Sequence, residues 1–506
     1  MIRMRWCPTA AVAAVVFLVG QACQAQVIDS RWIDDTSGTW VDPDRWSTPE
    51  FPSARGPDTY RAIIDFDAGG PYTISLSSAI DLDQLVYTSG DATIDGGGVG
   101  TLTVRTDIEL GDATITALAD LMSEGTLRFT GDALCEIDDT PSCHVGSVAR
   151  KTGTGDIAFL GSTVFELGSA TTFTIENSGD FIGDTTALLR NDGTFTKQSP
   201  GLTLIEDVQF ENNGTIVVQQ GTLEITNPVL PSPDTLGPAI YDVADGATLD
   251  LRGRTLTTNQ ASVFLRGPDA VFRELSAVDL NQGLVQVVSG ANVTFSATSG
   301  LRNEGDLIAA GAGSSIRTTS PLVNAGGTIT VQGGGEVLAG GPGLSNEGVV
   351  QGEGTIDAET FVNNGVVSPG NSPGVLVTEN ASGTNHVFQQ GTLGTLLIEI
   401  EGRTPGIDHD VLDVRGIALI NGTLDLRFAP FSGEPQVQPG DQFNIIFARG
   451  VDGAFQDVRV RGLGTEGQVD VFLNPNGVVV VVREVPTPGV LAVLGLGALA
   501  ASRRRR

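Results

Sequence analysis

Three histidines are the first residues to consider for acid–base chemistry, and they lie far apart at positions 144, 386 and 409. Only His409 has carboxylates beside it, Asp408 and Asp410. In a strand, alternation would place these two aspartates on one face and His409 on the other. We therefore interpret this triplet as a solvated turn rather than a catalytic dyad. The sequence also lacks the His-Glu-x-x-His and Walker motifs, so it predicts no enzyme.

Carboxylate pairs two residues apart are the second candidate, because such pairs can hydrolyse glycosidic bonds or hold Ca²⁺. The candidates that we single out are Asp65/Asp67, Asp81/Asp83 and Asp408/Asp410. A polysaccharide lyase would also need a base, but the two lysines, Lys151 and Lys197, are 46 residues apart and arginine stays protonated. We predict no catalytic residue, no metal site and no cofactor, with weak Ca²⁺ binding possible from charge alone. A lyase or glycoside hydrolase is the alternative.

The charge distribution is strongly acidic outside the two ends. All 60 acidic residues and 23 of the 29 basic residues lie within 26–502, which gives this stretch a net charge of −37. Nucleic acid and anionic lipid both need a basic surface, so the composition excludes them as partners of this stretch. Glycine is abundant, with 66 residues, but too irregular for collagen.

An apolar-x-Asn-x-Gly motif recurs along the middle of the chain. Its asparagines are Asn177, Asn191, Asn212, Asn303, Asn324, Asn346 and Asn363, and the recurring gap is 21 or 22 residues. A second series of turn glycines has the same period: Gly246, Gly267, Gly290, Gly313 and Gly335. A fixed period of this length indicates a repeat architecture.

The segments after these markers are short and rich in β-branched residues, as in Thr215–Val218 and Thr328–Val331. We predict an all-β protein, with a parallel β-helix (solenoid) of about 22 residues per coil over 111–376. Asparagine and glycine suit its corners because both tolerate positive φ, and asparagine can also stack in a ladder between coils. An array of antiparallel sandwiches is the rival fold.

The stretch 26–110 contains Trp32, Trp40 and Trp46, and we expect it to form a tryptophan-rich cap with the first strands. A solenoid needs such a cap at each end of its core. The alternative is a carbohydrate-binding platform, because aromatic faces stack on sugar rings. Cys135 and Cys143 flank a turn-forming stretch. In an oxidising compartment they would form a disulfide.

The two ends have the composition of targeting signals. Residues 1–25 combine Arg3 and Arg5 with an apolar run and small residues, which predicts a secretory signal peptide cleaved after Ala25. Cleavage after Ala22, with lipidation of Cys23, is the alternative. Residues 485–506 combine a proline motif, an apolar run too short to span a bilayer as a helix, and terminal arginines. The motif residues are Val485, Pro486, Thr487, Pro488, Gly489, Arg503, Arg504, Arg505 and Arg506.

This tail resembles the PEP-CTERM sorting signal, with Thr487 where that family usually has glutamate. The resemblance implies an exosortase-type sorting enzyme as a partner and a transient inner-membrane anchor. The tryptophan-rich start resembles that of autotransporter-like solenoid proteins, and Ser368–Leu376 resembles the turn that ends them. The stretch 377–484 resembles the β module that precedes PEP-CTERM tails. We expect short hydrophobic helices at both termini.

Taken together, these features predict an exported protein of the outer surface or extracellular matrix, with a structural or adhesive role. The PEP-CTERM resemblance implies association with exopolysaccharide, so polysaccharide and other surface proteins are the expected partners. A carbohydrate-binding protein and a polysaccharide-active enzyme are the other functions that the sequence leaves open.

Overall fold

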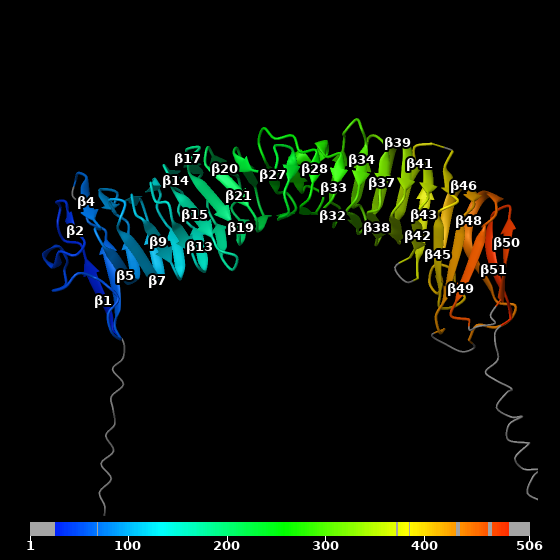
Figure 1. Cartoon of the computed structure of the whole chain (residues 1–506), viewed down its shortest axis with the longest axis horizontal. Helices are drawn as coiled ribbons and strands as arrows, with labels where there is room; N and C mark the ends of the chain where they lie inside the picture. The colour runs from blue at the N-terminus through cyan, green and yellow to red at the C-terminus, as the bar shows by residue number, and fades with distance from the viewer. Residues whose placement is uncertain are drawn as a thin grey trace, which may run out of the picture.

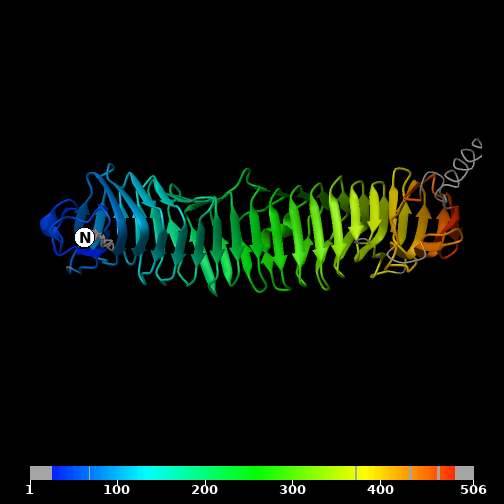
Figure 2. The ribbon, with the colours of Figure 1, turned by 90° about the horizontal axis from the view of Figure 1, so that it is seen from below.

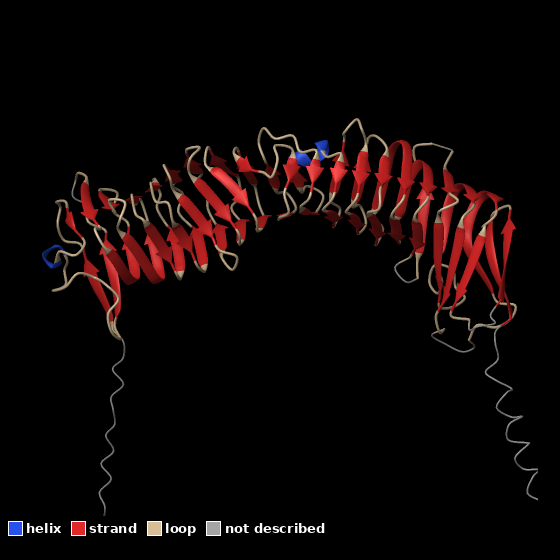
Figure 3. Cartoon of the chain, viewed as in Figure 1, coloured by secondary structure: helices blue, strands red, loops and turns tan. Residues whose placement is uncertain are grey.

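The computed structural model describes residues 26–67, 69–370, 373–383, 385–431, 436–463 and 468–484. The predicted signal peptide, the sorting tail and the hydrophobic terminal helices lie outside these residues. The described chain is almost entirely β-structure, with two short 3₁₀ helices, η1 (Pro43–Arg45) and η2 (Arg273–Ala277), as Figure 3 shows. No helix among the described residues is long and apolar enough to cross a membrane.

The strands form three sheets that run along the molecule. The longest sheet has 25 strands: β1 (Val27–Arg31), β3 (Thr59–Ile64), β5 (Ala79–Tyr87), β7 (Thr101–Leu110), β9 (Asp120–Ser123), β10 (Thr126–Phe129), β12 (Cys143–Val145), β13 (Val148–Lys151), β15 (Val164–Leu167), β16 (Thr172–Ile175), β18 (Leu188–Asn191), β19 (Thr194–Lys197), β21 (Gln209–Asn212), β22 (Thr215–Val218), β24 (Pro228–Val229), β26 (Ile240–Val243), β29 (Ser262–Arg266), β32 (Leu284–Val288), β35 (Asp306–Ala310), β38 (Thr328–Gln332), β40 (Val349–Gly352), β42 (Val366–Pro369), β45 (Thr395–Ile400), β47 (Thr423–Phe428) and β49 (Asp457–Arg461).

The other two sheets follow one another along the chain. The sheet of the N-terminal half has 11 strands: β2 (Gly38–Thr39), β4 (Tyr72–Ser75), β6 (Ala92–Asp95), β8 (Thr114–Thr116), β11 (Cys135–Asp138), β14 (Ile157–Leu160), β17 (Phe181–Gly183), β20 (Leu202–Glu206), β23 (Thr222–Ile225), β27 (Thr248–Asp250) and β30 (Val271–Phe272). The sheet of the C-terminal half has 15 strands: β25 (Thr235–Leu236), β28 (Thr258–Asn259), β31 (Leu280–Asn281), β33 (Asn292–Phe295), β34 (Leu301–Asn303), β36 (Ser315–Thr318), β37 (Leu322–Asn324), β39 (Glu336–Asn346), β41 (Thr355–Asn363), β43 (Val375–Glu379), β44 (Val387–Gln390), β46 (Val411–Ile420), β48 (Gln442–Gly453), β50 (Gln468–Asn474) and β51 (Gly477–Glu484).

Most strands pair in parallel with the strand one coil later. Thr126 pairs with Val148 and Thr172 with Thr194, and both pairs are 22 residues apart. The predicted parallel β-solenoid with a coil of about 22 residues is therefore confirmed, and the rival antiparallel sandwich array is wrong. The coils lie side by side along one axis, which bends into an arch (Figures 1 and 2).

The solenoid is longer than the sequence predicted. Parallel pairing starts at β1 with β3, inside the expected cap of 26–110, and continues to β47 with β49, inside the expected module of 377–484. The C-terminal stretch is therefore mostly further coils rather than a separate β module. Among the paired strands, only β48, β51 and β50 pair antiparallel, and they close the C-terminal end.

Asparagine side chains form a ladder along one corner of the solenoid, as predicted. Each Nδ2 donates to the Oδ1 of the asparagine one coil later, at 2.7–2.8 Å, through Asn259, Asn281, Asn303, Asn324, Asn346 and Asn363. The last of these donates to Gln390 Oε1 at 2.8 Å. All seven side chains are buried, so the ladder satisfies polar groups that water cannot reach.

Most ladder asparagines are followed two residues later by a glycine that is needed for lack of space, and not for the positive φ that the sequence predicted. Gly305 and Gly348 do not have positive φ. Instead, a Cβ on Gly305 would lie inside van der Waals contact of the carbonyl oxygen of Gly283, and a Cβ on Gly348 would meet Gly327 in the same way. In the other glycine series, Gly246, Gly267, Gly290 and Gly313 have positive φ, as predicted, whereas Gly335 does not.

Both lysines of the chain are buried in the solenoid. Lys151 and Lys197 occupy the same row, separated by Ile175. Lys197 Nζ donates to the carbonyl oxygen of Ser199 at 2.6 Å and to its Oγ at 2.9 Å. Lys151 Nζ donates to the carbonyl oxygens of Gly153 and Ser178, at 3.0 and 2.7 Å. Neither lysine is available as a surface base.

Burial lowers the pKa of Lys197 to about 8, which makes its contribution to stability depend on pH. An unfolded lysine titrates near 10.4, so between these values the unfolded chain binds more protons and the contribution of this group rises with pH. Between pH 7 and pH 10, the unfolding free energy of wild type should therefore rise by about 2 kcal/mol relative to that of Lys197→Met, which lacks the titrating group.

The unfolding free energies of the variant and of wild type are measured by guanidinium unfolding at each pH. Their difference removes the effect of the other titrating groups, which are the same in both proteins. Burial raises the pKa of Cys143 and Tyr87, so their contributions fall with pH in both proteins. A difference between the two proteins that does not change with pH would contradict the expectation.

Candidate functional site

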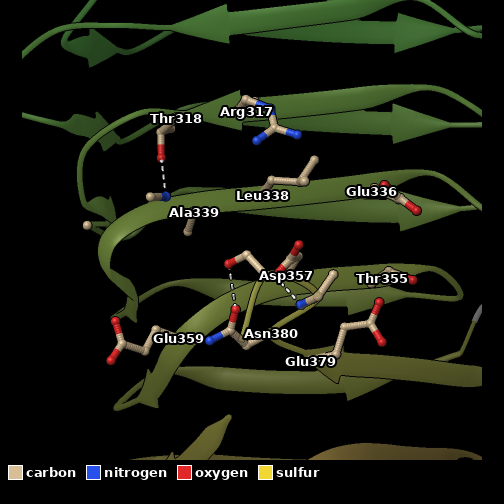
Figure 4. A pocket seen from close by; sticks show the side chains of 14 residues that line it. Arg317, Thr318, Glu336, Leu338, Ala339, Thr355, Asp357, Glu359, Glu379 and Asn380 are labelled. Carbon is tan, nitrogen blue, oxygen red and sulfur yellow. Dashed lines mark hydrogen bonds between the residues drawn. The ribbon is translucent and has the colours of Figure 1, made fainter. Parts of the chain in front are cut away.

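A groove with a volume of about 510 Å³ lies on the outer surface of the 15-stranded sheet, over β36, β39, β41 and β43. Figure 4 shows its side chains, which include four carboxylates and one guanidinium: Glu336, Asp357, Glu359, Glu379 and Arg317. The volume is within the range of ligand-binding pockets. We call it the acidic groove.

Strand register sets the spacing of these side chains. Arg317, Leu338, Asp357 and Glu379 hold one register position on four successive strands. Neighbouring strands are about 4.8 Å apart, so Asp357 and Glu379 are like charges on adjacent strands. Glu379 is offset by Arg415, whose Nη1 is 2.6 Å from its Oε2.

The segment that follows β43 forms one wall of the acidic groove. Asp357 Oδ1 accepts a hydrogen bond from the backbone N–H of Ala381 at 3.1 Å. Ser382 Oγ donates to Asn380 Oδ1 at 2.9 Å. Among the described residues, Arg317 has no acidic partner within 4.0 Å. The groove therefore contains a clear acidic excess and one unpaired cation.

The acidic groove can bind a polar or cationic group, and its carboxylates differ in exposure: Asp357 and Glu379 are half-buried. A general acid at neutral pH needs a raised pKa, which burial supplies in glycosidases. Glu336 and Glu359 are exposed to solvent. Arg317 stays protonated and is a poor base. The sequence analysis singled out none of these five residues. Asp357 and Glu359 lie two residues apart on β41, but Arg317, Glu336 and Glu379 join them only through the register of strands about 20 residues apart.

His386 is buried close to the acidic groove. Its Nδ1 lies 2.7 Å from the carbonyl oxygen of Ala358, which can only accept, so Nδ1 carries the proton. Its Nε2 has no hydrogen-bond partner among the described residues. Burial lowers the pKa of His386, so the ring is neutral at pH 7 and contributes no charge to the groove.

The predicted carboxylate pairs of the N-terminal part are occupied by arginines. Arg105 contacts Asp81 and lies 3.9 Å from Asp83, and Arg31 contacts Asp65. Asp67 is exposed. An arginine therefore contacts at least one carboxylate of each pair.

His409 and Asp410 are buried and Asp408 is half-buried, which corrects the expectation of a solvated turn. His409 Nδ1 and Nε2 lie 3.3 Å from the carbonyl oxygens of Gly402 and Asn444. Asp410 accepts hydrogen bonds from the backbone N–H groups of Gly374 and Glu399, and burial raises its pKa to about 7. Asp408 accepts from the backbone N–H of Thr404 at 3.0 Å. These contacts tie loops to the core.

The three tryptophans form the N-terminal cap and offer no face to a sugar. Trp32, Trp40 and Trp46 are 0–3% exposed, with ring centroids 5.2 Å apart for Trp32–Trp46 and 4.9 Å for Trp40–Trp46. Their Nε1–H groups donate to backbone carbonyls of Asp34, Pro52 and Trp40. The weaker carbohydrate-binding interpretation of these residues is therefore wrong, because stacking needs an exposed ring.

The predicted disulfide is absent from the structure, in which Cys135 and Cys143 are free and buried. Cys135 pairs with Ile157 in the 11-stranded sheet, whereas Cys143 pairs with Phe165 in the 25-stranded sheet. Each thiol enters the core from a different face of the coil, where cysteine packs as a small apolar residue.

We expect both thiols to be unreactive in the folded protein. Burial raises the pKa of Cys135 to about 12 and also raises that of Cys143, so little thiolate forms at pH 8. In the native state, residues 26–506 should react slowly with a thiol reagent. In guanidinium without reductant, both cysteines should react. Labelling in guanidinium that requires reductant would establish the disulfide instead.

The described residues contain no group of three or more His, Cys, Asp or Glu side chains that could hold a metal ion. The weak Ca²⁺ binding expected from charge remains a prediction. Searches against protein-family models and curated proteins find no match to this chain.

Proposed function

We propose that this protein is an exported structural or adhesive component of the outer surface or extracellular matrix, associated with exopolysaccharide. The observation that carries the proposal is the continuous solenoid core, whose buried asparagine ladder runs from Asn259 to Gln390. A stack of this kind gives a long, stiff body in which each coil contacts only its neighbours. Such a body suits a load-bearing or spacing role.

The targeting part of the proposal rests on the two ends of the sequence and is tested separately. Deleting 486–506 should release the protein into the medium or leave it in a different cell fraction from the full chain. A second variant deletes the four terminal arginines alone and should be missorted in the same way, because these residues belong to the proposed signal. Identical fractionation of the full chain and the 486–506 deletion would contradict the sorting-tail proposal.

A polysaccharide-active enzyme is the second candidate, because the acidic groove brings four carboxylates and Arg317 together on one face. Its test is the release of reducing ends or unsaturated products from neutral, amino and uronate polysaccharides. Activity that disappears in Asp357→Asn and persists in Asp67→Asn would place an active site in the groove. No product from any polysaccharide would leave the structural role as the function.

A further inference from the structure

A second groove, distinct from the acidic groove, lies on the outer surface of the 25-stranded sheet over β38, β40, β42, β45 and β47. Its volume is about 370 Å³. The labels of β38, β42 and β45 in Figure 1 show that this surface is the concave side of the arch. We call it the concave groove.

Strand register arranges the side chains of the concave groove in rows along the solenoid axis. Thr330, Gln351 and Ser368 hold one register position on successive strands. Val349 and Val366 form a neighbouring apolar row. Five strands at about 4.8 Å spacing span about 19 Å, which is the length of a short oligosaccharide lying along the axis.

Hydrogen-bonding groups in the concave groove are left open to a ligand. Gln351 Nε2 donates to Thr330 Oγ1 at 3.3 Å, which orients the amide and leaves its Oε1 free. Among the described residues, no group forms a hydrogen bond with the side-chain amide of Gln332 or with the side-chain hydroxyl of Ser368. Amide and hydroxyl groups beside an apolar row match the hydroxyls and the C–H faces of a sugar ring.

Charge separates this groove from the rest of the molecule. Its lining contains one acid, Glu399, and one base, Arg427, which hold the same register position on adjacent strands. The chain as a whole has a net charge of −31. The groove is therefore balanced, and it neither attracts an amino polysaccharide nor supplies the several cations that a uronate chain needs.

Backbone contacts hold one wall of the concave groove in place. Gly370 follows β42, and its N–H donates to the carbonyl oxygen of Gly352 at 2.8 Å. Gly352 has a φ of 110°, and a Cβ there would lie inside van der Waals contact of the Val331 carbonyl oxygen. The wall is thus part of the solenoid framework and available before any ligand binds, which lowers the entropy cost of binding.

We propose that the concave groove binds a strand of uncharged polysaccharide that lies along the solenoid axis, with Gln332, Gln351 and Ser368 hydrogen-bonding to its hydroxyls. The inference rests on the proposed association with exopolysaccharide and names the surface and the ligand class. It assigns no role to the acidic groove.

Affinity electrophoresis of the full chain tests the proposal, in gels that contain hydroxyethyl cellulose, galactomannan, alginate or glycol chitosan. We expect retardation in at least one neutral gel and none in alginate. The double variant Gln332→Ala/Gln351→Ala should weaken binding about tenfold, because it removes two hydrogen-bonding amides. Gln286→Ala is the matched control, since Gln286 precedes Thr330 by two coils in the same outward row and lies outside the groove.

The outcomes separate this inference from the proposed function. Retardation of wild type that the double variant retains would overturn the groove assignment and leave the polysaccharide association standing. Retardation in glycol chitosan alone would overturn the assignment and point to the acidic groove. Migration unchanged in all four gels would overturn both. An unchanged circular dichroism spectrum and thermal midpoint would show that the double variant is folded.

Discussion

Replacing Asn324 with alanine is expected to lower the local unfolding free energy by about 3 kcal/mol, because a buried polar group left without its partner costs 1–3 kcal/mol. Asn324 is fully buried in the middle of the ladder. Its Nδ2 donates to Asn346 Oδ1 at 2.7 Å and to the carbonyl oxygens of Gly327 and Val349 at 3.0 and 3.1 Å. Its Oδ1 accepts from Asn303 Nδ2 at 2.8 Å. Alanine removes all four bonds and leaves a cavity.

Hydrogen exchange measured by mass spectrometry suits this test better than a global unfolding curve, because long repeat arrays do not unfold in one step. Peptides from 322–366 should lose protection, whereas peptides from 27–64 should not change. Asn213→Ala is the control, since Asn213 is exposed and its side chain donates only to the acidic side chains of Asp192 and Glu211. Equal exchange in the two variants would show that the ladder adds little stability.

A second substitution at the same site separates hydrogen bonding from packing. Asn324→Asp keeps the shape but replaces the Nδ2 donor with an oxygen, which faces the acceptor oxygens of Asn346 and Val349. Burial raises the pKa of such a carboxyl, so the folded state keeps the proton to a higher pH than the unfolded state. Its stability should therefore fall as pH rises, and the variant should recover toward pH 4.

The repeat was predictable from the sequence because the same residue types return at a fixed interval, and the interval sets the coil. The ladder was only partly predictable. Asn281 is followed by Gln282 and Gly283, as the motif requires, but Asp279 stands where the motif has an apolar residue. Asn259 has Ala261 where the motif has glycine. The strict motif therefore missed two members of the ladder, although each is paired and buried in the same way.

The grooves were not predictable, for a physical reason. Thr330, Gln351 and Ser368 carry no local signature, because they are ordinary outward-facing residues of three different coils. Only the register of the strands brings them together, and a one-residue slip would turn each to the other face. The errors at the cysteines and His409 have a related origin, since sequence alone did not show how these side chains enter the core.

The glycines of the Asn-x-Gly corners support a further prediction of large effect, at Gly305. A Cβ there would lie inside van der Waals contact of the carbonyl oxygen of Gly283, which belongs to the backbone and cannot rotate away. Overpacking of a well-ordered interior costs 1–3 kcal/mol or more, so Gly305→Ala should destabilise the coil by about 3 kcal/mol. Gly70→Ala is the control, because nothing lies within 4 Å of a Cβ at Gly70 and its φ is not positive.

The two possible reasons for a corner glycine predict opposite responses to asparagine, which tolerates a left-handed backbone but brings a full side chain. Gly313 has a φ of 80°, and its nearest neighbour, Gly290 Cα, would be 3.7 Å from a Cβ, so Gly313→Asn should fold with stability close to wild type. Gly305→Asn should be at least as destabilising as Gly305→Ala, because space and not φ is limiting there. Hydrogen exchange of peptides from 301–332 measures both variants against wild type. If Gly305→Asn keeps the protection of wild type, corner glycines are selected for backbone conformation. If it loses protection, the spacing of the coils excludes a side chain from this corner.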